Sequence, residues 1–190
     1  SSSVSRFLTF ELGRGDRENL KRVFSTAIFV HIGLALLVLL IAETAGLWFV
    51  NNKMVIPADR LYAANWVFQA SVISFCFSLI SAPYRASIVS HEHLSVFAII
   101  GILDTCLHLA SVLFIAHSPW EFDKLIVYST LLVSINITLQ CVYQIYCRKH
   151  FEECVIRKRW SKKYIKEISS FTGWNFIGCA ADLLKDQGVN

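Results

Sequence analysis

The sequence predicts an all-α integral membrane protein, a multi-pass bundle of helices that each cross the bilayer. Hydrophobic residues make up 55% of the 190 residues and charged residues only 17%, whereas a soluble domain carries about 25% charge. The mean hydropathy of +0.51 agrees with this reading. A soluble domain of this length would show short apolar stripes, but here the apolar residues form long, nearly continuous runs.

Four runs are long enough for a membrane helix, which needs about 20 apolar residues to cross a core about 30 Å thick. They comprise residues 23–42, 61–84, 94–116 and 125–147, and Asp104 is the only charged residue within them. Transmembrane strands are short and alternate in polarity, so these runs predict helices. Pro83 is expected to end the second helix. A fifth, less apolar candidate begins near Tyr164.

Lys and Arg in the loops predict the orientation of the helices, because cytoplasmic loops are enriched in these residues. Fourteen lie in the first, third and fifth loops and three in the second and fourth. The fourteen are Arg6, Arg14, Arg17, Lys21, Arg22, Arg85, Arg148, Lys149, Arg157, Lys158, Arg159, Lys162, Lys163 and Lys166, and the three are Lys53, Arg60 and Lys124. The first, third and fifth loops are therefore predicted to be cytoplasmic. The net charge of +4 reflects this asymmetry, and nucleic acid is not an expected partner.

A charged pair is predicted inside the third span. Asp104 and His108 lie four residues apart and therefore share a helix face, together with Ser111. A carboxylate near the bilayer centre costs at least about 2.5–3.5 kcal/mol, so Asp104 is expected to face the bundle interior or a wet cavity. A structural bridge to His108 and a role in substrate binding or proton coupling both fit this pattern.

Amides and hydroxyls mark further stripes within the spans. Asn136 and Gln140 share a face of the fourth span, and Asn65 and Gln69 share a face of the second. For Asn136 and Gln140, helix packing and cavity lining are both open. Close helix packing is the favoured interpretation for four serines on roughly the opposite face of the second span. These are Ser71, Ser74, Ser78 and Ser81.

No motif for catalysis, a metal or a cofactor is found, so the chain is not predicted to be an enzyme. None of the six Cys forms a CxxC pair, and apolar packing is their expected role. The two imidazoles of His91–Glu92–His93 would point apart on a helix, so no metal site is predicted there.

The basic segment 148–166 predicts either an amphipathic helix on the anionic inner leaflet or a solvated loop. In both interpretations it links two bundles.

Short segments along nearly the whole chain resemble one family. They are Ser5–Gly13, Gly15–Asp16 with a basic run into Phe24–Ser25, Glu43–Phe49, Pro57 with Arg60, Ala63–Trp66 with Gln69, Pro83–Ala86 with His91–Glu92, Phe171–Asn175 and Gln187–Asn190. Their order and spacing resemble bacterial polysaccharide (O-antigen or lipopolysaccharide) flippases of the multidrug/oligosaccharidyl-lipid/polysaccharide exporter superfamily. The sequence departs from that pattern at Arg85 and His108, where a small polar residue and a lysine are expected.

The resemblance implies a two-lobed transporter of twelve or more helices in a bacterial inner membrane. Residues 1–147 would belong to the N-terminal lobe, beginning in the loop after its second helix and covering helices three to six. Residues 148–166 would form the cytoplasmic linker, and residues 167–190 would begin the C-terminal lobe with helix seven. We therefore expect the chain to be an internal fragment of a longer protein.

The implied activity is the flipping of undecaprenyl-pyrophosphate-linked oligosaccharides by alternating access, for cell-surface polysaccharide biosynthesis. The implied partners are this lipid-linked oligosaccharide, membrane lipids and other polysaccharide assembly proteins. Groups on the substrate pathway would bind sugar hydroxyls, sugar faces or the pyrophosphate. The candidates are Asn65, Gln69, Arg85, Asp104, His108, Asn136, Gln140, Trp174 and Asn175.

Two other functions stay open. A cation-coupled multidrug exporter of the same superfamily would use an intramembrane carboxylate such as Asp104, with His108 nearby. A membrane-embedded polysaccharide polymerase or acyltransferase would need a catalytic His or Asp near a membrane face. For that chemistry, the segment His91–Glu92–His93 is the only cluster in the sequence.

The predicted topology is testable by introducing single cysteines into a Cys-free chain. Cysteines in place of Asp16, Glu92 or Arg157 should resist a membrane-impermeant thiol reagent added to intact cells, because the basic loops are retained inside. Cysteines in place of Asn52 or Ser118 should react. Labelling of the Arg157 position from outside would overturn the topology.

Overall fold

The computed structural model describes residues 2–117, 123–154, 164–165, 170 and 174. Within these residues the chain is helical throughout, apart from short turns. Four stretches are long and apolar enough to cross a membrane: Arg17–Asn52, Ala58–Ser90, Leu94–His117 and Lys124–His150. The predicted all-α fold with four membrane-length spans is therefore confirmed. Most of the linker and of the fifth candidate span lie outside the described residues.

The N-terminal segment is a helix, α1 (Ser2–Arg14), where the sequence analysis expected a loop. Val4 and Leu8 lie one helical turn apart and are both fully buried, which places an apolar stripe against the neighbouring helices. The helix ends at Gly15, whose φ of +70° permits the sharp reversal into α2. Asp16 caps α2 by accepting a hydrogen bond from the Asn19 backbone N–H at 3.0 Å.

The first span, Arg17–Asn52, is longer than the apolar run of residues 23–42 from which it was predicted. Helix α2 (Arg17–Ile41) passes into a π-helical turn, η1 (Ala42–Gly46), and continues as α3 (Leu47–Asn52). Glu43 lies inside this turn. Gly46 packs closely on α4, because a Cβ built there would lie 2.5 Å from Cζ of Phe68 and the Phe68 ring would have to move.

Pro83 does not end the second span, contrary to the prediction. A 3-10 turn, η2 (Ala58–Arg60), leads into α4 (Leu61–Ser90), which contains Pro83 seven residues before its end. Pro83 is itself fully buried. Proline removes one backbone donor, but membrane helices tolerate this when neighbouring groups satisfy the freed carbonyls.

The last two spans form an antiparallel pair. Helix α5 (Leu94–His117) follows the turn His91–His93, and α6 (Lys124–His150) begins at Asp123, whose side chain accepts a hydrogen bond from the Leu125 N–H at 3.0 Å. After α6 the chain turns at Phe151 into a short 3-10 helix, η3 (Glu152–Cys154).

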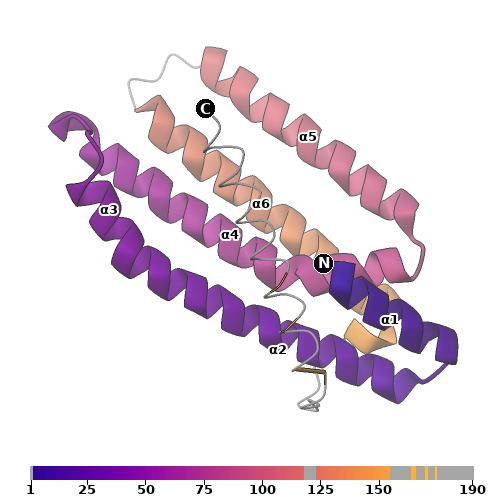
Figure 1. The fold of residues 1–190 in the computed structure, drawn as a ribbon. Helices are drawn as coiled ribbons and strands as arrows, with labels where there is room; N and C mark the ends of the chain where they lie inside the picture. The colour runs from indigo at the N-terminus through magenta and orange to yellow at the C-terminus, as the bar shows by residue number, and fades with distance from the viewer. Residues whose placement is uncertain (1, 118–122, 155–163, 166–169, 171–173, 175–190) are drawn as a thin grey trace, which may run out of the picture.

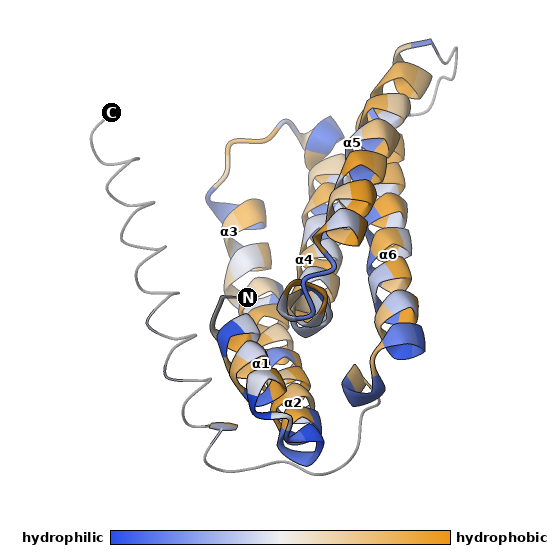
Figure 2. Ribbon diagram, turned by 90° about the vertical axis from the view of Figure 1, so that its right-hand side faces the viewer, coloured by the Kyte–Doolittle hydropathy of each residue, from blue (hydrophilic) through white to orange (hydrophobic). Residues whose placement is uncertain are grey.

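Helix α4 is the centre of the arrangement. It is flanked by α2 and α6, while α5 packs on α6 and, less extensively, on α4 (Figure 1). Among the described helices, α2 and α5 share no extensive contact, so the four spans form an open row rather than a closed ring. Hydrophobic residues cover most of the length of each span, and hydrophilic residues concentrate at the ends (Figure 2).

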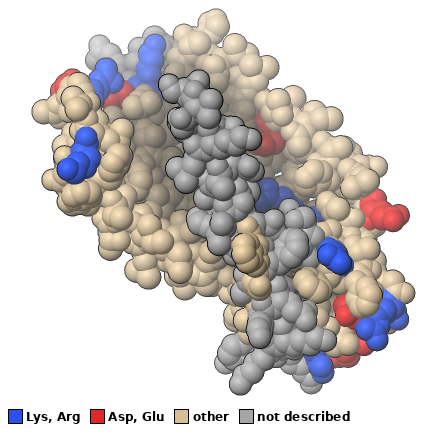
Figure 3. Space-filling view, viewed as in Figure 1, with Lys and Arg blue, Asp and Glu red and all other residues tan. Residues whose placement is uncertain are grey.

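One end of the row is basic and closely packed. Here α1, the start of α2 and the ends of α4 and α6 meet, with Arg14, Arg17, Arg22, Arg148 and Lys149 on these elements. Charged side chains gather at the ends of the molecule, with a largely uncharged surface between them (Figure 3). The end at which α1, the start of α2 and the ends of α4 and α6 meet is called the basic end. It also holds most of the buried core, which includes Leu8, Phe24, Ile28, Tyr84, Ile88, Cys147 and Cys154.

The turn between α4 and α5 contains a backbone conformation that suits glycine. Glu92 has a φ of 59°, and the left-handed conformation costs a side-chain-bearing residue about 1–2 kcal/mol. Glu92→Gly should therefore raise the unfolding free energy by up to about 1 kcal/mol, net of the entropy that glycine adds to the unfolded chain. Glu92→Ala keeps the Cβ and should give no such gain. Thermal unfolding of the purified protein in lipid measures both, and equal stability of the two variants would contradict the prediction.

Candidate functional site

A cavity of about 480 Å³ lies between α4 and α6, with His108 of α5 beside them. Its wall is mostly apolar, and polar side chains from all three helices reach it: Ser71, Ser74, Ser78, His108, Tyr128, Ser129 and Asn136. Ser78, Asp104 and Asn136 lie about 15–21 Å along their helices from the basic end, at 1.5 Å per residue. In a bilayer core about 30 Å thick, these groups would lie near its middle. Three of the serines assigned to helix packing thus contribute to a cavity.

Asp104 and His108 form the pair that their spacing predicts. The Nε2 atom of His108 lies 3.2 Å from Oδ1 of Asp104, and the two side chains are 43% and 48% exposed. His108 lines the cavity, and the next polar residue on this face, Ser111, is buried and donates to the carbonyl of His108 at 2.7 Å. Because protein atoms leave this pair half uncovered, it is open to water, to substrate or to another helix.

Asn136 and Gln140 also meet, and they differ in exposure. The Nε2 group of Gln140 donates to Oδ1 of Asn136 at 3.2 Å. Asn136 lines the cavity, whereas Gln140 is buried and its Oε1 atom has no hydrogen-bond partner within the described part of the chain. The bond fixes the orientation of the Asn136 amide so that its Nδ2 group remains available as a donor.

Asn65 and Gln69 lie on the other side of α4. The amides of Asn65 and Asn51 donate to each other at 3.0 and 3.1 Å, and Gln69 donates to Oε2 of Glu43 at 3.2 Å. Asn65 precedes Ser74 by nine positions, and Gln69 precedes Ser78 by nine. Nine residues make two and a half helical turns, so the two amides lie on the face of α4 opposite these cavity serines. These amides join α4 to η1 and α3, so the structure does not bring them together with the cavity residues.

Arg85 extends from the basic end toward the middle of α4. Its Nη2 group donates to the carbonyl oxygen and to Oγ of Ser78, both at 3.1 Å. Among the described residues no carboxylate forms a salt bridge with Arg85. The Tyr143 hydroxyl lies within electrostatic range of both Arg85 and Asp104. A guanidinium with only neutral partners in this position is suited to bind an anion.

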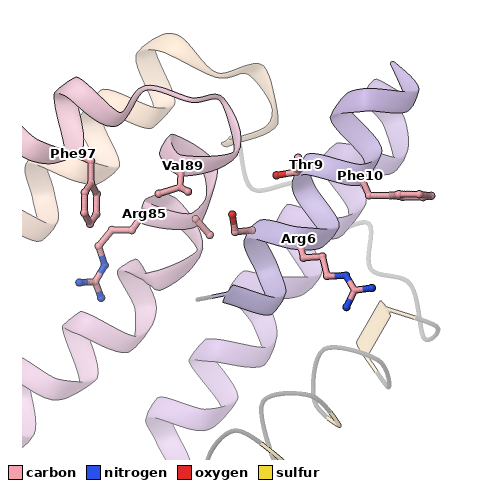
Figure 4. A pocket seen from close by; sticks show the side chains of 8 residues that line it. Arg6, Thr9, Phe10, Arg85, Val89 and Phe97 are labelled. Carbon is pink, nitrogen blue, oxygen red and sulfur yellow. The ribbon is translucent and has the colours of Figure 1, made fainter.

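A second cavity, of about 800 Å³, adjoins Arg85 at the basic end between α1, α4 and α5. It is lined by Arg6 and Phe10 of α1, Arg85 of α4 and Phe97 of α5 (Figure 4). The Arg6 and Arg85 side chains extend away from each other in this view, so they do not form a clamp. Arg85 lines this cavity and bonds to Ser78, which lines the first. It therefore connects the two cavities.

The remaining candidates lie apart from these cavities or outside the described residues. Trp174 is 72% exposed, and Asn175 is not among the described residues. Sequence reasoning missed Tyr128, which lines the first cavity, and Glu153, which is buried at the basic end. A single tyrosine near the end of a span gives no signal that separates cavity lining from an interfacial anchor.

Comparison of the chain with protein-family models, with curated proteins and with solved structures finds no match. The 480 Å³ cavity offers hydroxyl, amide and imidazole groups. The Asp104 carboxylate pairs with its His108, and the Arg85 guanidinium bonds to its Ser78 from the side facing the basic end. Such a set can hydrogen-bond a neutral polyhydroxylated ligand and attract an anionic group.

The half-exposed Asp104–His108 pair should be replaceable without loss of folding. Asp104→Asn should keep its membrane abundance within about twofold of the wild type, because an amide costs less than a carboxylate in the bilayer and exposed pairs contribute little. His108→Gln should behave alike, and Thr105→Ala, at an exposed position of α5, is the matched control. Quantitative immunoblotting measures abundance. A strong loss in either single variant that the double variant restores would identify a structural bridge instead.

Proposed function

We propose that this chain is part of a two-lobed membrane transporter that flips lipid-linked oligosaccharides by alternating access. The observation that carries the proposal is the group of hydroxyl, amide and imidazole side chains in the cavity between α4, α5 and α6, with Arg85 bonded to its Ser78. Lipid-facing helices do not place serines, an amide, an imidazole and a cation toward hydrocarbon. Polar residues inside a bundle instead mark a path for a polar substrate.

The two parts of the proposed substrate match the two kinds of group present. Sugar rings require many weak, uncharged hydrogen-bonding partners, which Ser74, Ser78, Ser129 and Asn136 provide. A pyrophosphate requires a cation with several donors, and Arg85 has guanidinium donors that are not engaged by a carboxylate among the described residues. The resemblance of the loop and span motifs to polysaccharide flippases supports the same substrate class.

The orientation follows from the basic end. With its arginines and lysines, this end would lie on the cytoplasmic side of a bacterial inner membrane, where lipid-linked precursors carry their head groups. The 800 Å³ cavity would then be the first one that a head group meets, and Arg85 would pass the pyrophosphate toward the central cavity. The second lobe and the remaining helices would complete the enclosure around this path.

A cation-coupled multidrug exporter is the second candidate, favoured by one observation. Asp104 and His108 form a half-exposed carboxylate–imidazole pair on α5, and such pairs occur in proton relays. Drug accumulation in a deletion strain, measured with and without the proton gradient, distinguishes this function from polysaccharide export. Sensitivity to drugs with normal surface polysaccharide would favour the exporter.

The proposal predicts a specific loss on removing the Arg85 charge. Arg85→Gln should lower surface polysaccharide about tenfold or more in a complemented deletion strain, because a hydrogen bond to a charged group contributes about 1.5–3 kcal/mol. Arg85→Lys should retain part of the transport. Arg60→Gln is the control, because Arg60 is exposed at the opposite end and pairs with Asp123. Wild-type polysaccharide in Arg85→Gln cells with normal protein abundance would remove Arg85 from the substrate path.

A further inference from the structure

The sequence motif His91–Glu92–His93 serves a purpose other than metal binding. Within the described residues, no group of three His, Cys, Asp or Glu side chains is placed to hold a metal ion. Instead the two imidazoles enclose the ring of Phe151, the first residue after α6. His91 stacks on this ring at 4.1 Å with an interplanar angle of 11°, and His93 meets it at 5.3 Å and 67°.

Two residues further along, Glu153 enters the protein interior. It is 4% exposed, and its Oε1 atom accepts a hydrogen bond from Ser87 Oγ at 3.1 Å and lies 2.5 Å from Nε2 of His91. Cys154, which is fully buried, contacts the same hydroxyl, with its Sγ atom 3.6 Å from Ser87 Oγ. The segment Phe151–Cys154 is thus inserted against the last turn of α4 and the turn that follows it.

The preceding glutamate shows how unusual this placement is. Glu152 is 68% exposed and pairs with Arg17 at 3.2 Å on the surface, a kind of contact that contributes little to stability. A buried carboxylate is stable only while its hydrogen bonds are complete, and removing one partner is strongly unfavourable. The Glu153 contact is therefore present as a whole or absent as a whole.

We propose that the turn His91–His93 and the segment Phe151–Cys154 form a latch that holds the basic ends of α4 and α6 together and opens as a unit. That this opening belongs to a transport cycle rests on the proposed function. The existence of the latch does not. When the latch opens, Glu153 and Cys154 become exposed and α6 is free to move relative to α4.

Cys154 is a natural reporter of this opening. In the closed latch it is fully buried, and a hydrogen bond with the Cys147 thiol together with burial raises the pKa of Cys154 well above its usual range. The thiol is then both shielded and protonated, and the thiolate is the reactive form. Reaction of Cys154 with a maleimide therefore requires the latch to open.

The first test measures this reaction in the purified full chain in lipid nanodiscs, with each cysteine followed by peptide mass spectrometry. Glu153→Ala should accelerate labelling of Cys154 about tenfold or more, because it leaves the partners of a buried carboxylate unsatisfied. Glu152→Ala is the matched control and should change the rate less than about twofold. Should Glu153→Ala fail to fold, Glu153→Gln keeps an acceptor for Ser87, removes only the charge, and should still raise the rate. Equal rates for the Glu152 and Glu153 variants would refute the latch.

The second test locks the latch. Ser87→Cys, combined with Cys147→Ala to avoid mispairing, places a thiol beside Cys154 that copper phenanthroline can oxidise to a disulfide. Uptake of undecaprenyl-pyrophosphate-linked oligosaccharide into vesicles should then stop on oxidation and recover on reduction, while the same chain with Cys154→Ala should not respond. Full transport by the cross-linked protein would refute opening of the latch during transport. Absence of transport by the whole transporter that contains the unmodified chain would refute the proposed function, and the labelling rates would still decide whether the latch opens.

Discussion

Tyr84 joins three helices at the basic end, and the rest of the arrangement follows from that junction. Its ring meets Phe24 of α2 edge-on at 5.2 Å, and its carbonyl accepts a hydrogen bond from the Cys147 thiol of α6 at 3.3 Å. All three residues are fully or almost fully buried. Van der Waals packing and buried hydrogen bonds are the forces that associate helices in lipid. Because these contacts concentrate at one end, α2 and α6 are fixed beside α4 there, and the 480 Å³ cavity lies further along α4 and α6.

The position of Arg85 is a consequence of the same region of α4. Pro83 has no N–H to donate to the carbonyl of Leu79, and Arg85 donates to the carbonyl of Ser78, one residue earlier. Helical side chains lean toward the N-terminus of their helix, which here is toward the middle of the bilayer. A cation at that depth costs about 2.5–3.5 kcal/mol or more. Neutral oxygens of Ser78 offset part of this cost, and an anionic ligand would offset more.

Apolar run length and helical spacing were sufficient to predict the four spans and the Asp104–His108 pair, because both depend on local sequence. Which neighbouring helix or cavity each polar stripe faces was not predictable from local sequence. Asn65 bonds to α3 and Gln69 bonds to η1, whereas Asn136 lines the cavity. The positions of the neighbouring helices, and not the periodicity of the sequence, decide which helix face is covered. Pro83 was misjudged because the residue pattern alone does not show that α4 continues past a proline that is buried among neighbouring helices. Glu153 gave no signal, because a glutamate in a basic, apparently solvated segment does not differ in sequence from its exposed neighbour Glu152.

Helix α5 is the span whose position depends least on packing. Only Ile100 and Ser111 are buried along its length, and no described residue of α2 makes extensive contact with it. Yet α5 carries the carboxylate–imidazole pair Asp104 and His108, and His108 lines the cavity. Elements held by few buried apolar contacts are those that move at low free-energy cost. A change in charge or partner at this pair therefore acts on the helix that resists displacement least, and any displacement of α5 alters the cavity that it closes together with α4 and α6.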